Sequence, residues 1–341
     1  MNAHATPLKF LFPGWYAIVM GLCGLALAWH RAEPLMGPAA GAVTVAVGGL
    51  AAAVFGVLAV ATLVRGQRHP EAWAEDRRHP VRHTFVATLP IAVLLLATVA
   101  VALGPRGVPI DALWWIGALA QLVVTLWVLG RWWNGNQAGG LQWASATPAL
   151  FIPIVGNVLV PLAGVPLGHA DWSAAQFGVG LLFWPVAMVL VVVRIAIQGL
   201  WPERLRPTSF ILIAPPAVVG LSALQLGAPT AVGWGLWGMA MFTLLWVGVQ
   251  SRRIAALPFG LPHWGLSFPL AAMAALTLRL GAPGSAMAQL GLALLALASV
   301  VIAWLALATV RGLRDGSLLM PEPVAALQPA VGPIGAEAAK P

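Results

Sequence analysis

The chain has 341 residues, of which 60% are hydrophobic and only 8% are charged, and its mean hydropathy is +0.89. A soluble domain carries roughly 25% charged residues, so a water-exposed surface of ordinary composition is excluded. The net charge of +8 does not indicate nucleic-acid binding, because the basic residues are spread along the whole chain. The single cysteine, Cys23, excludes an intrachain disulfide.

Ten apolar runs follow one another along the chain, each long enough to cross a bilayer as a helix. The runs are continuously apolar and lack the alternation of barrel strands, which favours helices. We therefore predict a cytoplasmic N-terminus over 1–11, one transmembrane domain over 12–313 and a disordered cytoplasmic tail over 314–341. The predicted spans are 12–30, 38–64, 84–103, 111–130, 147–167, 172–198, 208–227, 230–250, 264–280 and 284–310.

The basic residues between the runs predict the orientation. Of the 18 Lys and Arg residues, 15 fall in segments at one end of the bundle and only Arg31, Arg106 and Arg279 at the other. The positive-inside rule then places both termini in the cytoplasm, which requires an even number of spans. The predicted cytoplasmic loops are 65–83, 131–146, 199–207 and 251–263.

Prolines distinguish the odd-numbered spans from the even-numbered ones. Each odd span carries proline near its predicted cytoplasmic start, where proline is expected to kink the helix. We interpret the alternation as five helical hairpins, in which kinked odd helices form an inner ring and even helices an outer ring. Both a central pore and a packed bundle axis satisfy this pattern. The prolines are Pro13, Pro90, Pro148, Pro153, Pro215, Pro216 and Pro269.

The predicted spans hold almost no ionisable side chains. No charged residue lies between Arg131 and Asp171 or between Arg206 and Arg252. Proton or sodium relays normally need a carboxylate within the membrane, and cation channels commonly use acidic rings. A pore without carboxylates and with a basic cytoplasmic mouth favours anions. The 69–83 segment, with His and acidic residues, is the nearest approach to a metal site, and a solvated loop is the stronger interpretation.

Four sequence strings resemble the tellurite-resistance/dicarboxylate transporter family (TehA-like), which includes plant slow-type anion channels and yeast-type malate transporters. Their order along the chain matches the odd helices of that family. The strings are Phe12-Pro13-Gly14-Trp15-Tyr16, Ala146-Thr147-Pro148 through Gly156-Asn157, Leu205-Arg206-Pro207-Thr208 through Pro215-Pro216, and His263-Trp264-Gly265-Leu266-Ser267-Phe268-Pro269-Leu270.

The resemblance implies a homotrimer in which the five odd helices of each subunit line a pore for small inorganic or organic anions. It also implies that Phe268, directly before Pro269, is an aromatic gate. We expect a multi-pass protein of the bacterial inner membrane that acts as a channel or facilitator, without enzymatic activity or cofactor. The predicted pore-lining residues are Gly14, Pro90, Gly156, Asn157, Pro215, Phe268 and Pro269.

Two alternative functions are also compatible with the sequence. One is a secondary transporter of C4-dicarboxylates or tellurite-type oxyanions, with or without proton coupling, although the missing intramembrane carboxylates disfavour tight coupling. The other is a membrane enzyme or a structural subunit of a larger complex. Such a protein needs a cluster of polar residues at one membrane face, and only the 69–83 segment approaches one.

Overall fold

The computed structural model describes residues 7–320 except 136, 138 and 139. Of the described residues, 84% are helical, and no strand occurs among them. Within these residues, eight helices are long and apolar enough to cross a membrane. They are α2 (Pro38–Arg68), η3–α4 (Arg82–Leu103), α5–η4 (Val108–Asn134), α8 (Ala170–Gln198), η7–α9 (Glu203–Gln225), α10 (Thr230–Gly248), η8–α12 (Leu261–Leu280) and α13 (Ala286–Arg314).

The two remaining apolar runs are also helical. Helix α1 (Ala17–Met36) has 20 residues, and its last turns carry His30, Arg31 and Glu33. The run Pro148–Gly164 is shorter and is divided into η6 (Pro148–Leu150), α6 (Phe151–Val158) and α7 (Val160–Gly164). Shorter elements complete the chain: η1 (Pro7–Phe10), η2 (Pro13–Tyr16), α3 (Pro70–Arg78), η5 (Trp143–Ser145) and α11 (Ser251–Ala255).

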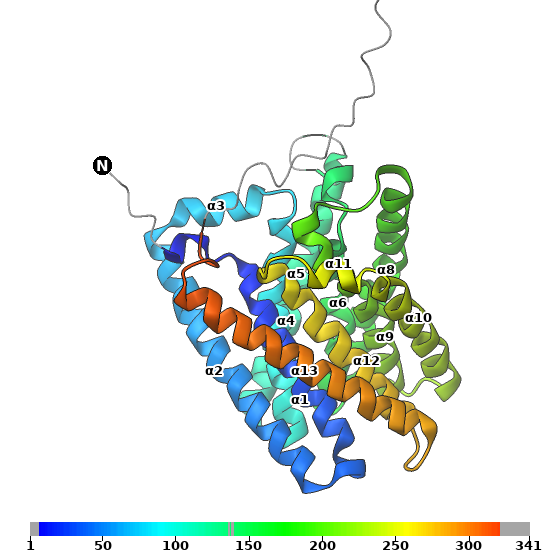
Figure 1. The fold of residues 1–341 in the computed structure, drawn as a ribbon. Coiled ribbons are helices and arrows are strands. Elements are labelled where there is room, and N and C mark those ends of the chain that lie inside the picture. The colour runs from blue at the N-terminus through cyan, green and yellow to red at the C-terminus, as the bar shows by residue number, and fades with distance from the viewer. Residues whose placement is uncertain (1–6, 136, 138–139, 321–341) are drawn as a thin grey trace, which may run out of the picture.

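Helices that follow one another in the chain pack side by side in pairs (Figure 1). The pairs are α1 with α2, α4 with α5, α6 with α8, α9 with α10, and α12 with α13. One member of a pair is far more buried than the other. In the most apolar 18-residue window, 61–83% of residues are buried in η3–α4, η7–α9 and η8–α12, against 22–33% in α2, α5–η4, α8, α10 and α13. All eight residues of α6 are buried as well.

The buried helices begin differently from the exposed ones. Each starts as a 3₁₀ turn (η2, η3, η6, η7 or η8) and continues as α-helix, whereas the exposed helices begin directly as α-helix. Pro90, Pro153, Pro215 and Pro269 fall within the first three residues of their α-helices. Proline has no N–H to donate to the preceding turn, and these prolines lie where the helix changes from 3₁₀ to α. The expected kinks are therefore 3₁₀-to-α transitions at the helix starts.

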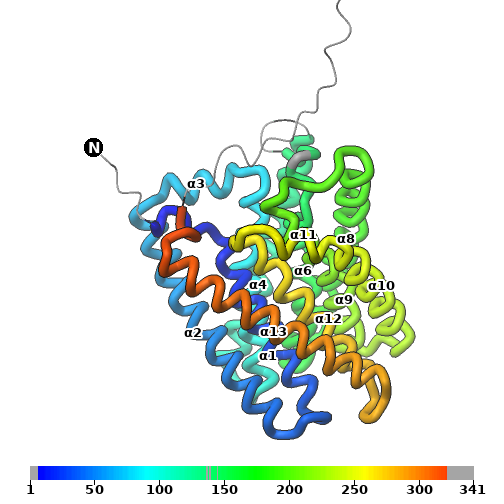
Figure 2. Tube along the Cα trace, in the orientation of Figure 1, coloured from blue at the N-terminus to red at the C-terminus, as the bar shows by residue number. Residues whose placement is uncertain are grey.

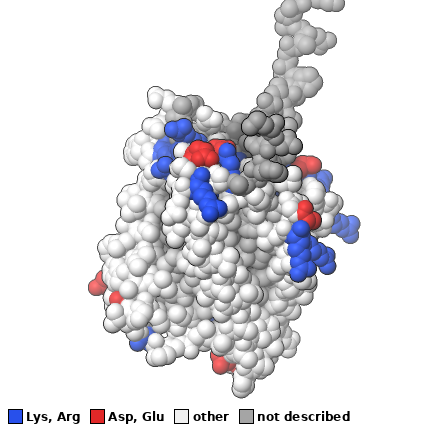
Figure 3. All heavy atoms as spheres, turned by 90° about the vertical axis from the view of Figure 1, so that its left-hand side faces the viewer, with Lys and Arg blue, Asp and Glu red and all other residues white. Residues whose placement is uncertain are grey.

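Most of the charged side chains visible in Figure 3 gather toward one end of the molecule, and a few lie at the opposite end. The chain trace in Figure 2 brings the first described residues, α3, α11 and the end of α13 to that same end. The 69–83 segment, interpreted above as a solvated loop, instead forms α3 and a turn, with Asp76 completely buried. Of the predicted tail, residues 314–320 are described and Leu318 packs against the core, while 321–341 lie outside the described residues.

Candidate functional site

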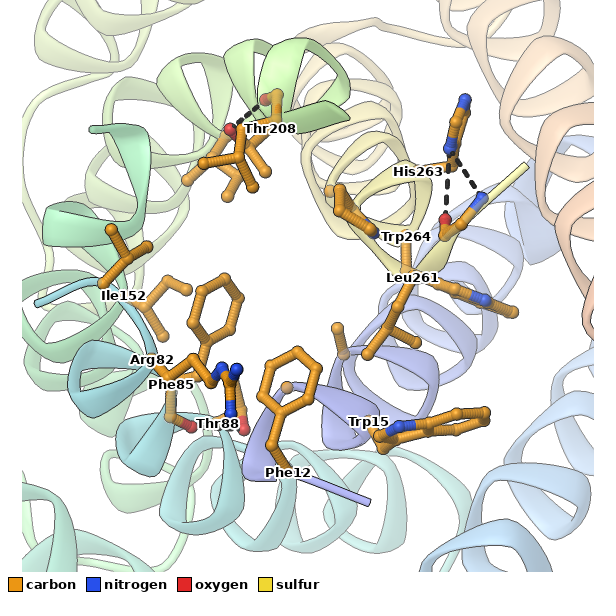
Figure 4. A pocket seen from close by; sticks show the side chains of 18 of the residues that line it. Phe12, Trp15, Arg82, Phe85, Thr88, Ile152, Thr208, Leu261, His263 and Trp264 are labelled. Atoms are coloured by element: carbon orange, nitrogen blue, oxygen red, sulfur yellow. Dashed lines mark hydrogen bonds between the residues drawn. The ribbon is translucent and has the colours of Figure 1, made fainter. Parts of the chain in front are cut away.

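A cavity of about 660 Å³ lies among the 3₁₀ starts of the buried helices. Figure 4 looks into it, with side chains from η2, η3, α6, η7 and η8 around the opening. The wall is mainly aromatic and aliphatic, and its charged residues belong to the end of the molecule that carries most basic residues. Prominent wall residues are Phe12, Trp15, Phe85, Thr88, Ile152, Val155, Thr208, Ile211, Leu261, Trp264 and Phe268.

Phe268 is the second residue of α12, directly after the 3₁₀ turn η8. Its side chain lines the cavity and is only 7% exposed. The ring rests against α1 at Gly24: a Cβ built on Gly24 would lie 2.9 Å from Cδ2 of Phe268 and 3.2 Å from Cβ of Ala271. A side chain at position 24 would require the Phe268 ring or α12 to shift, so glycine allows the ring to pack this closely against α1.

Some of the residues predicted from the sequence to line a pore line the cavity, and others do not. Gly14, Phe268 and Pro269 line the cavity. The other four, Pro90, Gly156, Asn157 and Pro215, are buried within their helices and do not belong to its wall.

Asn157 and Gly156 face the exposed helices α5 and α8. The Asn157 amide donates to Thr125 Oγ1 at 2.8 Å and accepts from Gln176 Nε2 at 3.1 Å. A Cβ on Gly156 would come within 2.3 Å of the Gln121 side chain, which donates to the Pro153 carbonyl at 2.8 Å. These contacts tie the short helix α6 to its neighbours through buried polar groups, as is typical of helix packing in membranes.

Several residues close before the prolines contribute to the wall. Phe12 directly precedes Pro13, Ile152 directly precedes Pro153, and Thr88 lies two residues before Pro90. Sequence reasoning selected the prolines themselves and missed these neighbours. Thr88 and Ile152 lie in the first two residues of α4 and α6, directly after 3₁₀ turns, and Phe12 directly precedes the 3₁₀ turn η2.

A largely buried ion-pair cluster lies at one side of the cavity. Nη2 of Arg65, at the end of α2, lies 2.7 Å from Oδ2 of Asp76 in α3. Nη1 of Arg82, the first residue of η3, lies 3.2 Å from Oδ1 of the same carboxylate. Arg65 and Arg82 line the cavity, whereas Asp76 does not. The guanidinium of Arg82 also lies 6.0 Å from the centre of the Phe12 ring, within reach of a cation–π contact.

Two further features border the cavity. His263 belongs to the wall residues, but Figure 4 shows its ring directed away from the opening, where Nδ1 meets the backbone of Gly260 at 3.1 Å. Ser317, Leu318 and Met320, just after α13, also line the cavity. Within the described residues, no group of three or more His, Cys, Asp or Glu side chains is placed to hold a metal ion.

Comparison with known proteins identifies the family to which this chain belongs. The model of a family described as SLAC1, voltage-dependent anion channel, matches residues 11–310. The tellurite resistance protein TehA homolog of Haemophilus influenzae is 26% identical over 80% of this chain and 83% of its own length. The S-type anion channel SLAH1 of Arabidopsis thaliana is 22% identical over 78% and 72% of the two chains, and its paralogue SLAH2 is 25% identical over 61% and 40%. The chain is therefore a multi-pass membrane protein that belongs to the SLAC1/TehA family of anion channels and transporters.

Proposed function

We propose that this protein is a channel or facilitator that passes small anions through the cavity and on along the axis between the buried helices. The observation that carries the proposal is the cavity itself, which has basic residues among its wall residues and Phe268 on its surface. Glu203 is the only carboxylate on the wall in the described part of the chain. Such a wall does not repel anions and lacks the acidic ring of a cation pathway.

The proposed architecture is ten transmembrane helices in five hairpins, with the proline-bearing helices as an inner ring. The pairwise packing of consecutive helices supports the hairpins, and the contrast in burial between partners supports the two rings. In this arrangement α1 and the Pro148–Gly164 segment span the membrane together with the eight longer helices. Interrupted helices are tolerated in a bilayer where protein surrounds them, and α6 is buried throughout.

Phe268 is proposed as the gate of this pathway. A bulky ring on the wall of an apolar passage hinders a hydrated anion both by its volume and by excluding water. Its low exposure and its support by Gly24 favour a defined resting position over a freely moving side chain. Gly14 and Pro269 remain proposed pathway residues, and the assignment of Pro90, Gly156, Asn157 and Pro215 to the same pathway stays a prediction.

The charge distribution supports an orientation with the cavity and both termini on the cytoplasmic side. A bacterial inner-membrane location fits the likeness to the TehA homolog of Haemophilus influenzae. A homotrimer is proposed from the family resemblance alone. A second candidate function is secondary transport of C4-dicarboxylates or tellurite-type oxyanions, which is favoured by the name of that same relative.

Reconstitution of the purified chain in liposomes tests the proposal. We expect flux of chloride, nitrate or formate down its gradient, at a rate that depends on membrane potential and not on the proton gradient. The same vesicles loaded with malate or tellurite test the second candidate. Reversal potentials that shift with pH at a fixed anion gradient would support the coupled carrier, and absence of any anion flux above protein-free vesicles would refute both.

A further inference from the structure

Two arginines lie at the end of the molecule opposite the cavity, where two of the buried helices end. Arg31 is near the end of α1, and Arg279 is in the last turn of α12. A third arginine predicted at this end, Arg106, lies in the segment between α4 and α5. Arg31 is partly buried, whereas Arg279 and Arg106 are exposed. We call Arg31 and Arg279 the outer arginine pair.

Helices α1 and α12 pack against each other and run in the same direction. A Cβ built on Gly21 would lie 2.6 Å from Cβ of Ser267, and one built on Gly24 would lie 3.2 Å from Cβ of Ala271. The two helices therefore advance together along the chain. The outer arginine pair follows about two turns after the second of these contacts in both helices. This register brings the two arginines to the same level.

The outer arginine pair lies on the helix faces that line the cavity at the other end. Arg31 follows the wall residue Met20 by 11 residues, and Arg279 follows the wall residue Phe268 by the same number. Both stretches are continuous α-helix. Eleven residues make about three turns, so each arginine shares a face with its wall residue to within roughly 20°. The pair therefore lies beyond the cavity, along the axis of the proposed pathway.

The outer arginine pair has no carboxylate partner within the described residues. The two positive charges are close enough to repel each other, and neither guanidinium group makes an ion pair or a hydrogen bond in this part of the chain. Glu33 is directed elsewhere: its Oε2 is 3.4 Å from Nδ1 of His30, and its Oε1 would be 3.1 Å from a Cβ on Gly41 in α2. An anion between the two guanidinium groups would relieve the repulsion.

We propose that Arg31 and Arg279 form an anion-binding site at the outer end of the pathway, which takes a halide, an oxyanion or a carboxylate group. Guanidinium groups suit oxyanions and carboxylates because they donate two parallel hydrogen bonds. Two adjacent positive charges also raise the local concentration of anions. Exposure of Arg279 to water keeps binding weak enough for release, as conduction requires. This inference rests on the proposed function, since it assigns a binding step to the same pathway.

Chloride flux through the full-length chain in liposomes tests the site, with chloride titrated from each side separately. Arg31→Gln removes one of two positive donors. The outer chloride concentration that gives half-maximal flux should therefore rise about tenfold, as expected for loss of one charge-assisted hydrogen bond. Arg279→Gln should act in the same direction. Titration from the cavity side should give the wild-type value in both variants.

Two control variants separate a binding site from the general charge of the outer face. Arg106→Gln removes an exposed positive charge from the same end of the molecule and should leave the half-maximal concentration unchanged. Arg31→Lys keeps the charge and should stay closer to wild type than Arg31→Gln. An equal rise in Arg106→Gln and Arg31→Gln would mean that the net charge of the face attracts anions, and it would overturn the site.

A direct measurement on the wild-type chain covers the case in which the variants fold poorly. Crystals soaked in bromide should show an anomalous peak between the guanidinium groups of Arg31 and Arg279. Absence of this peak, or a lipid phosphate in its place, would overturn the site and leave the proposed function standing. Wild-type flux with unchanged half-maximal concentrations in Arg31→Gln and Arg279→Gln would do the same. Absence of wild-type anion flux would instead refute the proposed function.

Discussion

Truncation of Phe268 to alanine is the sharpest test of the proposed gate. The side chain is almost fully buried against α1, and Phe→Ala in a packed core costs about 3–5 kcal/mol of stability. We expect a cost of about 3 kcal/mol, because one side of this ring faces the cavity and has fewer contacts to lose. If the ring adds ~1.4 kcal/mol or more to the barrier for anion passage, its removal raises flux about tenfold or more.

Phe210→Ala is the matched control. Phe210 is as buried as Phe268, at 6% exposed, and lies in η7, but it does not line the cavity. Both variants lose the same group of atoms from a buried position, so both should unfold at a lower temperature in detergent. Only Phe268→Ala should conduct more than wild type.

The assay is single-channel or macroscopic anion current in a planar bilayer, with the amount of folded protein checked by size-exclusion chromatography. Current should rise in Phe268→Ala and stay at or below the wild-type level in Phe210→Ala. A folded Phe268→Ala variant with wild-type current would refute the gate. An equal rise in both variants would mean that loosened packing, and not an opened passage, increases the current.

Three further predictions concern residues around the bundle axis. Gly24→Ala places a methyl group against the Phe268 ring and should push it into the cavity, lowering anion current; the current should recover in the double variant with Phe268→Ala, and a deficit that persists there would contradict the contact. Gly156→Ala should displace the Gln121 side chain at a cost of about 1–3 kcal/mol, measured as a lower unfolding temperature. Gly49→Ala is the control, because a methyl group there meets open space. An equal loss of stability in both variants would contradict the steric role of Gly156. Asn157→Leu should lower stability by about 0.6 kcal/mol per lost interhelical hydrogen bond without changing the chloride-to-nitrate permeability ratio. An altered ratio would indicate that Asn157 lines the anion pathway.

The positions of the helices were predictable from the sequence. All ten apolar runs are helical, although 147–167 is divided into three short helices and the first helix extends to Met36, beyond the predicted 30. Other boundaries agree more closely, as for 38–64 against Pro38–Arg68 and 172–198 against Ala170–Gln198. Bilayer thickness dictates the length of an apolar run, and each helix satisfies its own backbone hydrogen bonds. The information for these elements is therefore local, and hydropathy is sufficient to find them.

The placement of side chains around the cavity was only partly predictable. Phe268 and Gly14 lie on its wall, but Asn157 faces α5 and α8, where Gln176 and Thr125 bind its amide. The direction of a helical side chain depends on which neighbour lies on which face, and no local pattern in α6 encodes this. A continuously apolar helix gives no amphipathic signal, because both lipid and protein favour the same residues.

The ion-pair cluster of Arg65, Asp76 and Arg82 shows most clearly which features depend on the sequence alone and which depend on the tertiary structure. The sequence by itself determined that Arg65 and Arg82 belong to the basic end of the bundle, because charged residues avoid the membrane core. Only the tertiary structure decided that the two arginines converge on Asp76 and line one cavity, since α3 folds back between α2 and η3 and buries that carboxylate. Hydropathy measures how far a residue prefers to lie from lipid, whereas a binding site depends on which residues distant in the chain meet in space.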